Sequence, residues 1–181
     1  GYWQLISAVD TFIVYDNIKY TKKGWINRNR MLLNRRAAMF TLPLKADSDH
    51  LDISDREVAA SFNRERLLNQ IIGAYRKAPH FTETFPLIER IIRYDEDNLF
   101  LYLYHSLIHL CEHLGITTQV RISSHIPCDR TLKNTERVLS VCEALGADGY
   151  VNAIGGVALY SKSQFQEKGV SLEFVKSNLF Q

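Results

Sequence analysis

The sequence predicts an α/β fold, and three patterns carry the prediction. In the last third of the chain, short segments rich in β-branched residues alternate with helical segments through short joins, which is typical of a parallel sheet. In the middle, apolar residues recur at helical spacing in three successive segments. Before them, two basic strand-like segments flank a polar turn. Together these patterns predict a Rossmann-like parallel sheet, a helical middle section and a small basic hairpin.

The N-terminal elements follow from local patterns. Apolar residues in 2–8 are spaced as in a short helix, and residues 11–15 form a β-branched and aromatic run that predicts a buried strand. Two further strands are expected at 25–33 and 38–42. Polar and basic residues at 34–36 supply the hairpin turn between them.

The rest of the chain is predicted from periodicity, caps and helix breakers. A polar loop is expected over residues 46–55. Three helices then follow. The first begins at a cap, Ser61 or Asn63, and is ended by Pro79. The second begins at Thr82 or Thr84, with Pro86 in its first turn, and the third runs from Asp97 to Leu114 and is closed by Gly115. The last third predicts strands at 119–123, 150–152 and 170–175, a helix at 135–145 closed by Gly146, and a short helix behind a capping box at 161–164.

Composition narrows the class of protein. With 181 residues, of which 46% are hydrophobic, the chain is suited to a single α/β domain over residues 1–181. No apolar run approaches the roughly 20 residues that cross a bilayer, so no membrane span is expected. Three cysteines without CxxC spacing indicate reduced thiols in a cytoplasmic protein. Because the chain opens at Gly1 without a methionine and ends abruptly at Gln181, we expect it to be trimmed at both ends.

The most informative feature is a run of cations. Between Asn17 and Lys45 the chain has eight basic residues and no acidic one, namely Lys19, Lys22, Lys23, Arg28, Arg30, Arg35, Arg36 and Lys45. A protein of net charge +2 that gathers its cations in one segment is expected to meet an anion there, such as a phosphate, a carboxylate or a nucleic-acid backbone. The alternative is a purely structural role, in which the cations of an exposed edge hairpin prevent aggregation.

Within this run, each residue type suggests a role. Arg28 and Arg30, two apart on a strand, project from one face and can hold a phosphate or carboxylate in bidentate fashion. Lys22 and Lys23 precede a glycine and would form a mobile loop that closes over such a ligand. Trp25 could stack on a base or sugar ring.

Two residues are assigned as catalytic. Asp16 follows the first strand, and open α/β sheets bind ligands at the carboxyl ends of their strands. It would therefore hold a ribose hydroxyl, a metal or an attacking amine, while Asn27 orients the reactive group. The alternative for Asp16 is a turn cap with Asn17.

Weaker candidates follow strands in the last third. Ser123 and Asn152 lie at strand ends and are expected to contact substrate or phosphate. Backbone amides at Gly155 and Gly156 could cradle a phosphate, although turn geometry alone would explain the pair. The sequence assigns no cofactor. It also assigns no metal site, because histidines that step by four along the third helix more often form the solvent-exposed edge of an amphipathic helix. These are His105, His109 and His113.

Several segments carry a family resemblance. They are residues 10–20, 24–30, 41–45 and 145–150, with the glycine pair at 155–156. Through these segments the chain resembles the WbqC-like protein family, and the resemblance extends over essentially its whole length. The Trp-x-Asn-Arg-Asn-Arg element is specific. The resemblance implies a bacterial, cytoplasmic protein encoded among genes for O-antigen and other surface polysaccharides, with a nucleotidyltransferase-like α/β fold. A Gln-Pro-aromatic stretch and a Pro-Trp segment that the family carries at its two ends are absent here.

Two functions follow from these residues and the resemblance. The first is a transferase of O-antigen or surface-polysaccharide biosynthesis, acting on a nucleotide-sugar or another phosphorylated precursor. The second is a non-catalytic accessory protein that binds a biosynthetic enzyme or RNA, although the mild net charge does not favour nucleic acid. An enzyme needs Asp16, Asn27, Arg28, Ser123 and Asn152 around one cleft, whereas a binding protein needs its cations on a flat face.

Overall fold

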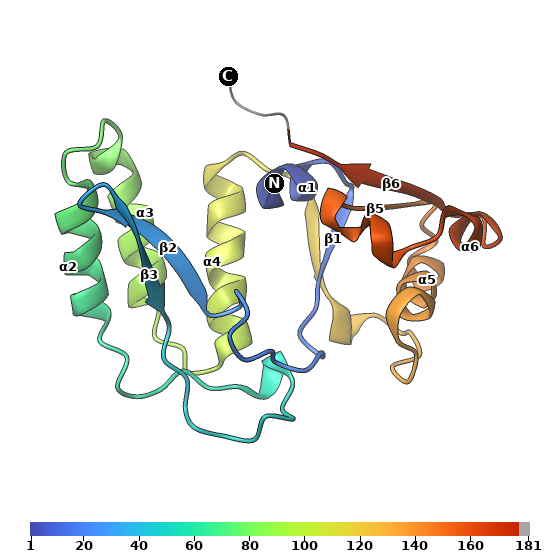
Figure 1. Ribbon diagram of the computed structural model, residues 1–181, viewed down its shortest axis with the longest axis horizontal. Coiled ribbons are helices and arrows are strands. Elements are labelled where there is room, and N and C mark those ends of the chain that lie inside the picture. The colour runs from blue at the N-terminus through green and yellow to red at the C-terminus, as the bar shows by residue number, and fades with distance from the viewer. Residues whose placement is uncertain (178–181) are drawn as a thin grey trace. The chain divides into compact units, whose positions relative to one another are not determined.

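The computed structural model describes residues 1–177, so the last four residues of the predicted domain lie outside the described part (Figure 1). The chain divides into two compact units. The first, called here the terminal unit, combines Gly1–Tyr15 with the chain from Cys111 onward. The second, the central unit, is Asp16–Leu110. Both contain helices and strands, which confirms the α/β class.

The terminal unit contains two parallel strand pairs. β1 (Thr11–Val14) pairs with β4 (Gln119–Ile122), and β5 (Gly149–Ala153) pairs with β6 (Ser171–Val175), each in parallel. Parallel pairing, predicted from the alternation of strands and helices, is confirmed as two separate two-stranded sheets among the described residues. The connecting elements are α1 (Tyr2–Ser7), the 3-10 turns η2 (Ser123–His125) and η3 (Ile154–Leu159), α5 (Asn134–Leu145) and α6 (Lys162–Gln166).

The core of the terminal unit lies between α5, α6 and the β5–β6 pair. Phe165 is fully buried, and the ring of Tyr150 stacks on it with centroids 5.4 Å apart. The predicted capping box before α6 is wrong, because Ser161 caps no backbone group of the helix. Its hydroxyl lies 2.8 Å from that of Ser163 instead, since two neighbouring hydroxyls satisfy one another.

The central unit is built around an antiparallel hairpin. β2 (Arg28–Leu33) and β3 (Arg36–Thr41) are joined by Asn34 and Arg35, whose φ angles of 50° and 62° suit the two-residue turn of a twisted hairpin. The hairpin is confirmed, but its first strand begins at Arg28 rather than at residue 25. After it come the 3-10 turn η1 (Ile53–Asp55) and the helices α2 (Arg64–Tyr75), α3 (Phe81–Arg93) and α4 (Leu99–His113). The central unit ends within α4, at Leu110.

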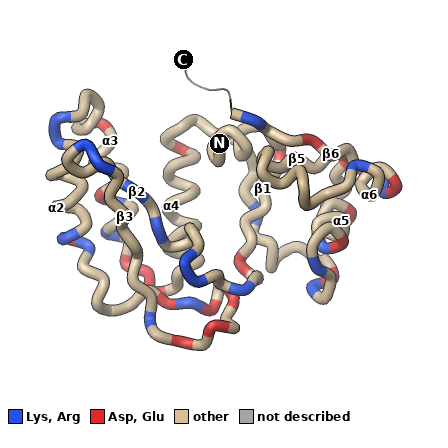
Figure 2. Tube along the Cα trace, viewed as in Figure 1, with Lys and Arg blue, Asp and Glu red and all other residues tan. Residues whose placement is uncertain are grey.

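The two faces of the hairpin differ in burial. On the inner face Met31 is buried against Leu68 and Ile71 of α2 and Ile92 of α3. Side chains alternate along a strand, so Arg28, Arg30 and Leu32 share the outer face. Along the tube in Figure 2, basic residues follow the hairpin and the loop that leads into it.

The predicted cap of α2 is confirmed, whereas the predicted start of α3 is not. Asn63 caps α2 as predicted, because its side-chain oxygen accepts a hydrogen bond of 2.8 Å from the Arg66 amide. The predicted start of α3 is wrong: this helix begins at Phe81, which places Pro86 inside it rather than in its first turn. Among the described residues, no helix is long and apolar enough to cross a membrane.

Candidate functional site

The loop that leads into the hairpin is tied to a second loop of the central unit. The amide of Tyr20 donates to the Leu51 carbonyl (3.0 Å), and the Ile53 amide donates to the Ile18 carbonyl (2.9 Å). Lys19 forms an isolated antiparallel bridge with Asp52. The first half of the basic loop is therefore held by backbone hydrogen bonds to a segment about thirty residues away.

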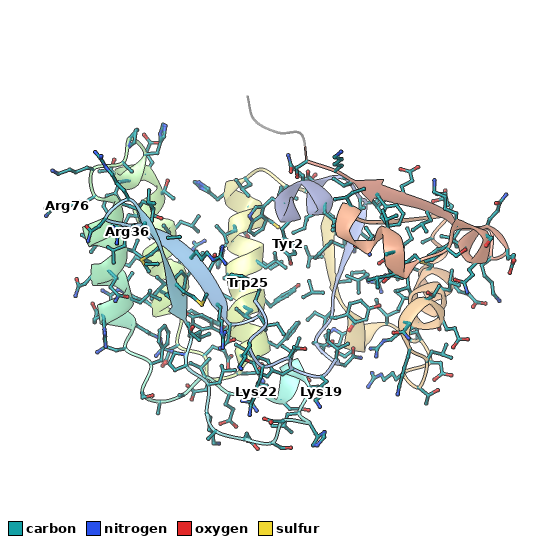
Figure 3. The ribbon with its side chains drawn as sticks, in the orientation of Figure 1. Tyr2, Lys19, Lys22, Trp25, Arg36 and Arg76 are labelled. Carbon is teal, nitrogen blue, oxygen red and sulfur yellow. The ribbon has the colours of Figure 1, made fainter. Side chains whose placement is uncertain are left out.

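Lys22 and Lys23 lie at the exposed turn of this loop. The ammonium of Lys22 forms an ion pair of 2.6 Å with Asp49, and both side chains are more than half exposed. Lys22 lowers the pKa of the Asp49 carboxyl, chiefly through this hydrogen bond. Lys23 has a φ of 64°, in the left-handed region. Lys22 is thus held by Asp49 in this structure, and Figure 3 shows it beside Lys19 at the end of the unit away from the hairpin tip.

A buried arginine supports the loop from below. Arg56 is only 5% exposed, and its guanidinium donates to the carbonyls of Ser48 (3.1 Å) and Lys45 (3.2 Å). The same guanidinium lies 5.0 Å from the centre of the Tyr20 ring. Because a cation over an aromatic face is attracted to it, Arg56 fixes the position of that ring. The buried position of Arg56 could not be predicted, since one arginine in a polar loop carries no signal of burial.

The Tyr20 ring in turn holds Asn27. The tyrosine hydroxyl donates to Asn27 Oδ1 (2.9 Å), and Asn27 Nδ2 donates to the Leu42 carbonyl (2.7 Å). All three residues are buried, and the Leu42 amide donates back to the Asn27 carbonyl at 2.8 Å. The side chain predicted to orient a reactive group therefore joins two segments of the backbone, and its catalytic role remains a prediction.

Asp16 is the other residue predicted to be catalytic. It is 5% exposed, and its backbone carbonyl accepts a hydrogen bond of 3.0 Å from the Ser54 amide. Asp16 is thus anchored in the same network of loops as Tyr20. Its side chain is buried within the central unit.

The outer face of the hairpin brings three predicted residues together. Trp25 is 59% exposed, and the Arg30 guanidinium lies 4.7 Å from the centre of its ring. Arg28 extends from the same face of β2 and is half-buried. Among the described residues, its Nε is buried without a hydrogen-bond partner. An exposed indole and two guanidiniums therefore lie within one short stretch. The sequence predicts the shared face of Arg28 and Arg30, whereas it does not predict the contact of Arg30 with Trp25.

In the terminal unit, the predicted residues lie at strand ends. Ser123 is 1% exposed and directly follows β4, next to Tyr15, which follows its partner β1. The guanidinium of Arg137 lies 5.2 Å from the centre of the Tyr15 ring. Burial raises the pKa of Tyr15, although Arg137 acts in the opposite direction. The contact of Arg137 with Tyr15 was not predicted, because the apolar spacing of its helix indicates only the face that packs in the core.

The glycine pair after β5 has unequal surroundings. Gly156 is buried, and a Cβ atom added there would lie 2.8 Å from Asn152 Nδ2, which is too close. Gly155 has no atom within 4 Å of the same position. Asn152 itself accepts a hydrogen bond of 2.7 Å from the Ala153 amide. Packing against Asn152 accounts for Gly156, and a phosphate-binding role for the pair remains a prediction.

The histidines of α4 have other partners. The ring of His105 stacks on Tyr94 with centroids 3.8 Å apart, and His109 Nδ1 lies 2.7 Å from an Arg90 nitrogen. Among residues 1–177, no group of three or more histidine, cysteine or acidic side chains could hold a metal ion.

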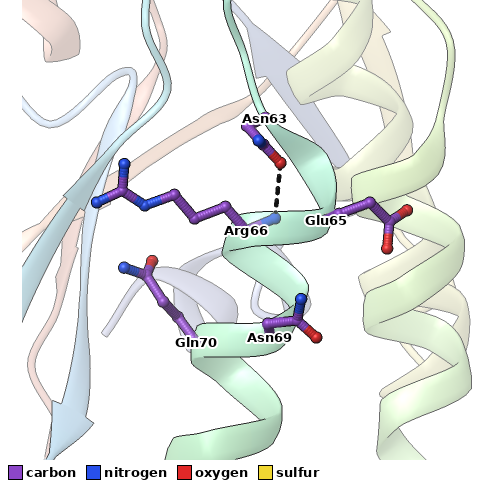
Figure 4. A pocket seen from close by; sticks show the side chains of 5 residues that line it. All are labelled: Asn63, Glu65, Arg66, Asn69 and Gln70. Atoms are coloured by element: carbon purple, nitrogen blue, oxygen red, sulfur yellow. Dashed lines mark hydrogen bonds between the residues drawn. The ribbon is translucent and has the colours of Figure 1, made fainter.

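Two surface hollows lie elsewhere. One runs along the first turns of α2 and is lined by Asn63, Glu65, Arg66, Asn69 and Gln70 (Figure 4). All of its lining comes from one helix and its cap, so it is open and shallow. The other lies between α1 and the segment 114–118 in the terminal unit. Neither hollow includes a residue predicted to bind substrate.

Comparison with known proteins assigns the chain to a family. The family model described as the WbqC-like protein family matches residues 1–181. An uncharacterized protein of Mycobacterium tuberculosis, Rv1507c, is 27% identical over 172 residues, covering 94% of this chain and 74% of that protein. No solved structure matches. The chain therefore belongs to the WbqC-like protein family.

Proposed function

We propose that this protein is a cytoplasmic transferase of surface-polysaccharide biosynthesis that acts on a nucleotide-sugar or a related phosphorylated precursor. The observation that carries the proposal is the group formed by Trp25, Arg28 and Arg30 on the outer face of the hairpin. An exposed indole with a guanidinium against it, beside a second guanidinium on the same face, suits a ligand that joins a ring to phosphates.

The chemistry of each group fits such a ligand. Guanidiniums bind phosphate oxygens in bidentate fashion, and the hydrogen bonds are strengthened by charge. The buried Nε of Arg28 has no hydrogen-bond partner among the described residues, which is consistent with a site completed by an anion. The exposed part of the Trp25 ring offers a surface for a base or a sugar.

The remaining predicted residues take supporting roles in this proposal. Asn27 positions the segment that carries both arginines, because its side-chain amide accepts a hydrogen bond from Tyr20 and donates one to the Leu42 carbonyl. Asp16 is the acidic group assigned to orient the acceptor. Lys22 would exchange its exposed partner Asp49 for a ligand phosphate, with Lys23 beside it.

Within the terminal unit, considered by itself, Ser123, Asn152, Gly155 and Gly156 are the residues proposed to contact substrate or phosphate. Parallel strand pairs and polar residues at strand ends support a Rossmann-like, nucleotidyltransferase-like arrangement for this unit. The family resemblance supports the biosynthetic setting, since its members are encoded among genes for O-antigen and other surface polysaccharides.

A second candidate function is a non-catalytic accessory protein that binds a biosynthetic enzyme or RNA. The observation that favours it is the openness of the hairpin's outer face, where Arg30 and Trp25 are exposed rather than recessed. An RNA-binding role predicts an affinity that falls steeply as salt is raised.

The test measures binding of nucleotide-sugars by calorimetry, with UDP-glucose, GDP-mannose and dTDP-glucose as probes. Arg28→Ala with Arg30→Ala should abolish binding while the unfolding midpoint stays nearly unchanged. The matched control is Arg36→Ala with Arg76→Ala, two exposed arginines at the far end of the same unit (Figure 3), and it should bind as the parent does. Equal binding by both double variants would contradict the proposal.

A further inference from the structure

The outer face of the hairpin also carries exposed apolar side chains. Leu32 is 53% exposed, Met39 is 55% exposed and Trp25 is 59% exposed. In the antiparallel register Met39 stands opposite Arg30, and Leu32 lies one pair further along the same face. These side chains form one patch, called here the hairpin patch, which consists of Trp25, Leu32 and Met39.

The hairpin patch lies outside the core cluster that the hairpin forms with α2 and α3. The opposite face of the same two strands supplies the core contact, through Met31, Ala38 and Phe40 against α2 and α3. Exposed apolar side chains that share one face more often mark an interaction surface than single apolar side chains scattered over the surface do.

Cations frame this patch without an acidic residue among them. Arg28 and Arg30 lie on the same face, and Arg35 and Arg36 form the exposed tip. No aspartate or glutamate occurs between Asn17 and Lys45. Arg28 and Arg30 on the outer face, together with the basic tip, are therefore complementary in charge to an anionic surface.

We propose that the hairpin patch and its arginines dock on an anionic lipid bilayer. Aliphatic side chains favour this occupant over single-stranded nucleic acid, because bases stack on aromatic rings and gain nothing comparable from leucine or methionine. At a bilayer interface, Trp25, Leu32 and Met39 enter the headgroup region while arginines reach lipid phosphates. Peripheral attachment of this kind needs no membrane-spanning helix.

This inference goes beyond the proposed transferase activity and does not depend on it. Leu32, Met39, Arg35 and Arg36 are outside the group proposed to bind nucleotide-sugars. Variants at these four positions therefore change membrane binding without touching Trp25, Arg28 or Arg30. Nucleotide-sugar binding by the same variants separates failure of one proposal from failure of the other.

The test is co-sedimentation with vesicles of phosphatidylcholine containing phosphatidylglycerol, compared with vesicles of phosphatidylcholine alone. The parent protein should sediment with the anionic vesicles and be released by salt. Leu32→Ser with Met39→Ser should weaken partitioning by about tenfold or more, since two apolar side chains no longer enter the interface. Arg35→Gln with Arg36→Gln should weaken it by about fivefold for each cation removed.

The matched control is Val157→Ser with Leu159→Ser, which removes two aliphatic side chains that are 49% and 71% exposed on η3. It should partition as the parent does, and circular dichroism of every variant should match the parent. The proposal is overturned if the parent ignores anionic vesicles, if the control loses as much as the hairpin variants, or if RNA but not lipid is bound in a salt-dependent way.

Discussion

Replacing Asn27 by alanine should destabilise the central unit strongly, because the amide of this residue satisfies two buried groups. The Tyr20 hydroxyl would lose its acceptor at 2.9 Å, and the Leu42 carbonyl would lose its donor at 2.7 Å. All three residues are at most 7% exposed, so water cannot replace the amide without opening the structure.

The expected loss of stability follows from the two buried groups that would be left without a hydrogen-bond partner. A buried donor or acceptor left without a partner costs about 1–3 kcal/mol, so Asn27→Ala should cost about 2–6 kcal/mol. This is a large share of a total stability of about 5–15 kcal/mol. In a chain of this length each kcal/mol shifts the unfolding midpoint by about 2–4 °C, so a fall of roughly 4–24 °C is expected.

The assay is urea unfolding followed by circular dichroism, with two comparison variants. Tyr20→Phe leaves only Asn27 Oδ1 without its donor and should cost about 1–3 kcal/mol. Asn29→Ala makes the same chemical change at an exposed position of the same segment and should stay within about 0.5 kcal/mol of the parent. If Asn27→Ala is as stable as Asn29→Ala and yet loses ligand binding, Asn27 acts on the ligand and the structural account of it is wrong.

Three further predictions concern the rest of the molecule. Gly156→Ala should destabilise by about 1–3 kcal/mol through its clash with a neighbouring amide, whereas Gly155→Ala should be near neutral in the same unfolding assay. Burial raises the pKa of Tyr102 to about 12 from 10.0, so its stabilising contribution is present below pH 10 and lost as pH rises toward 12. Urea unfolding across that range should show a shallower decline for Tyr102→Phe, and an identical decline would refute it. Burial raises the pKa of the Cys142 thiol, so in native protein the half-buried Cys128 should react first with a thiol reagent followed by mass spectrometry, and the reverse order would contradict this.

Local signals predicted most elements of the fold. The Asn63 cap, the hairpin turn at Asn34 and Arg35, and the left-handed glycine Gly146 after α5 each act within a few residues, so the sequence around them suffices. Pro86 shows the limit of such rules. A proline is most easily placed in a first turn, but here the helix extends five residues ahead of it, to Phe81.

Features of the candidate site that depend on distant partners were not predicted. Asn27 was expected on a strand, but its side chain is taken by Tyr20 and by Leu42, fifteen residues further on. Arg56 is buried because carbonyls of a loop surround its guanidinium, and no periodic pattern reports such a loop. The contact of Trp25 with Arg30 was not predicted either, because a strand that began at residue 25 would have placed these two side chains on opposite faces, whereas β2 begins at Arg28.

The most direct test of the central claim uses Trp25 itself as the reporter. The chain has two tryptophans, so Trp3→Phe leaves Trp25 as the sole indole. Titration of this variant with a nucleotide-sugar should change its fluorescence saturably, and adding Arg28→Ala with Arg30→Ala should remove the change. Adding Arg36→Ala with Arg76→Ala instead should leave the affinity as it was. A titration that leaves the fluorescence of Trp25 constant, or one whose affinity survives loss of Arg28 and Arg30, would contradict the account.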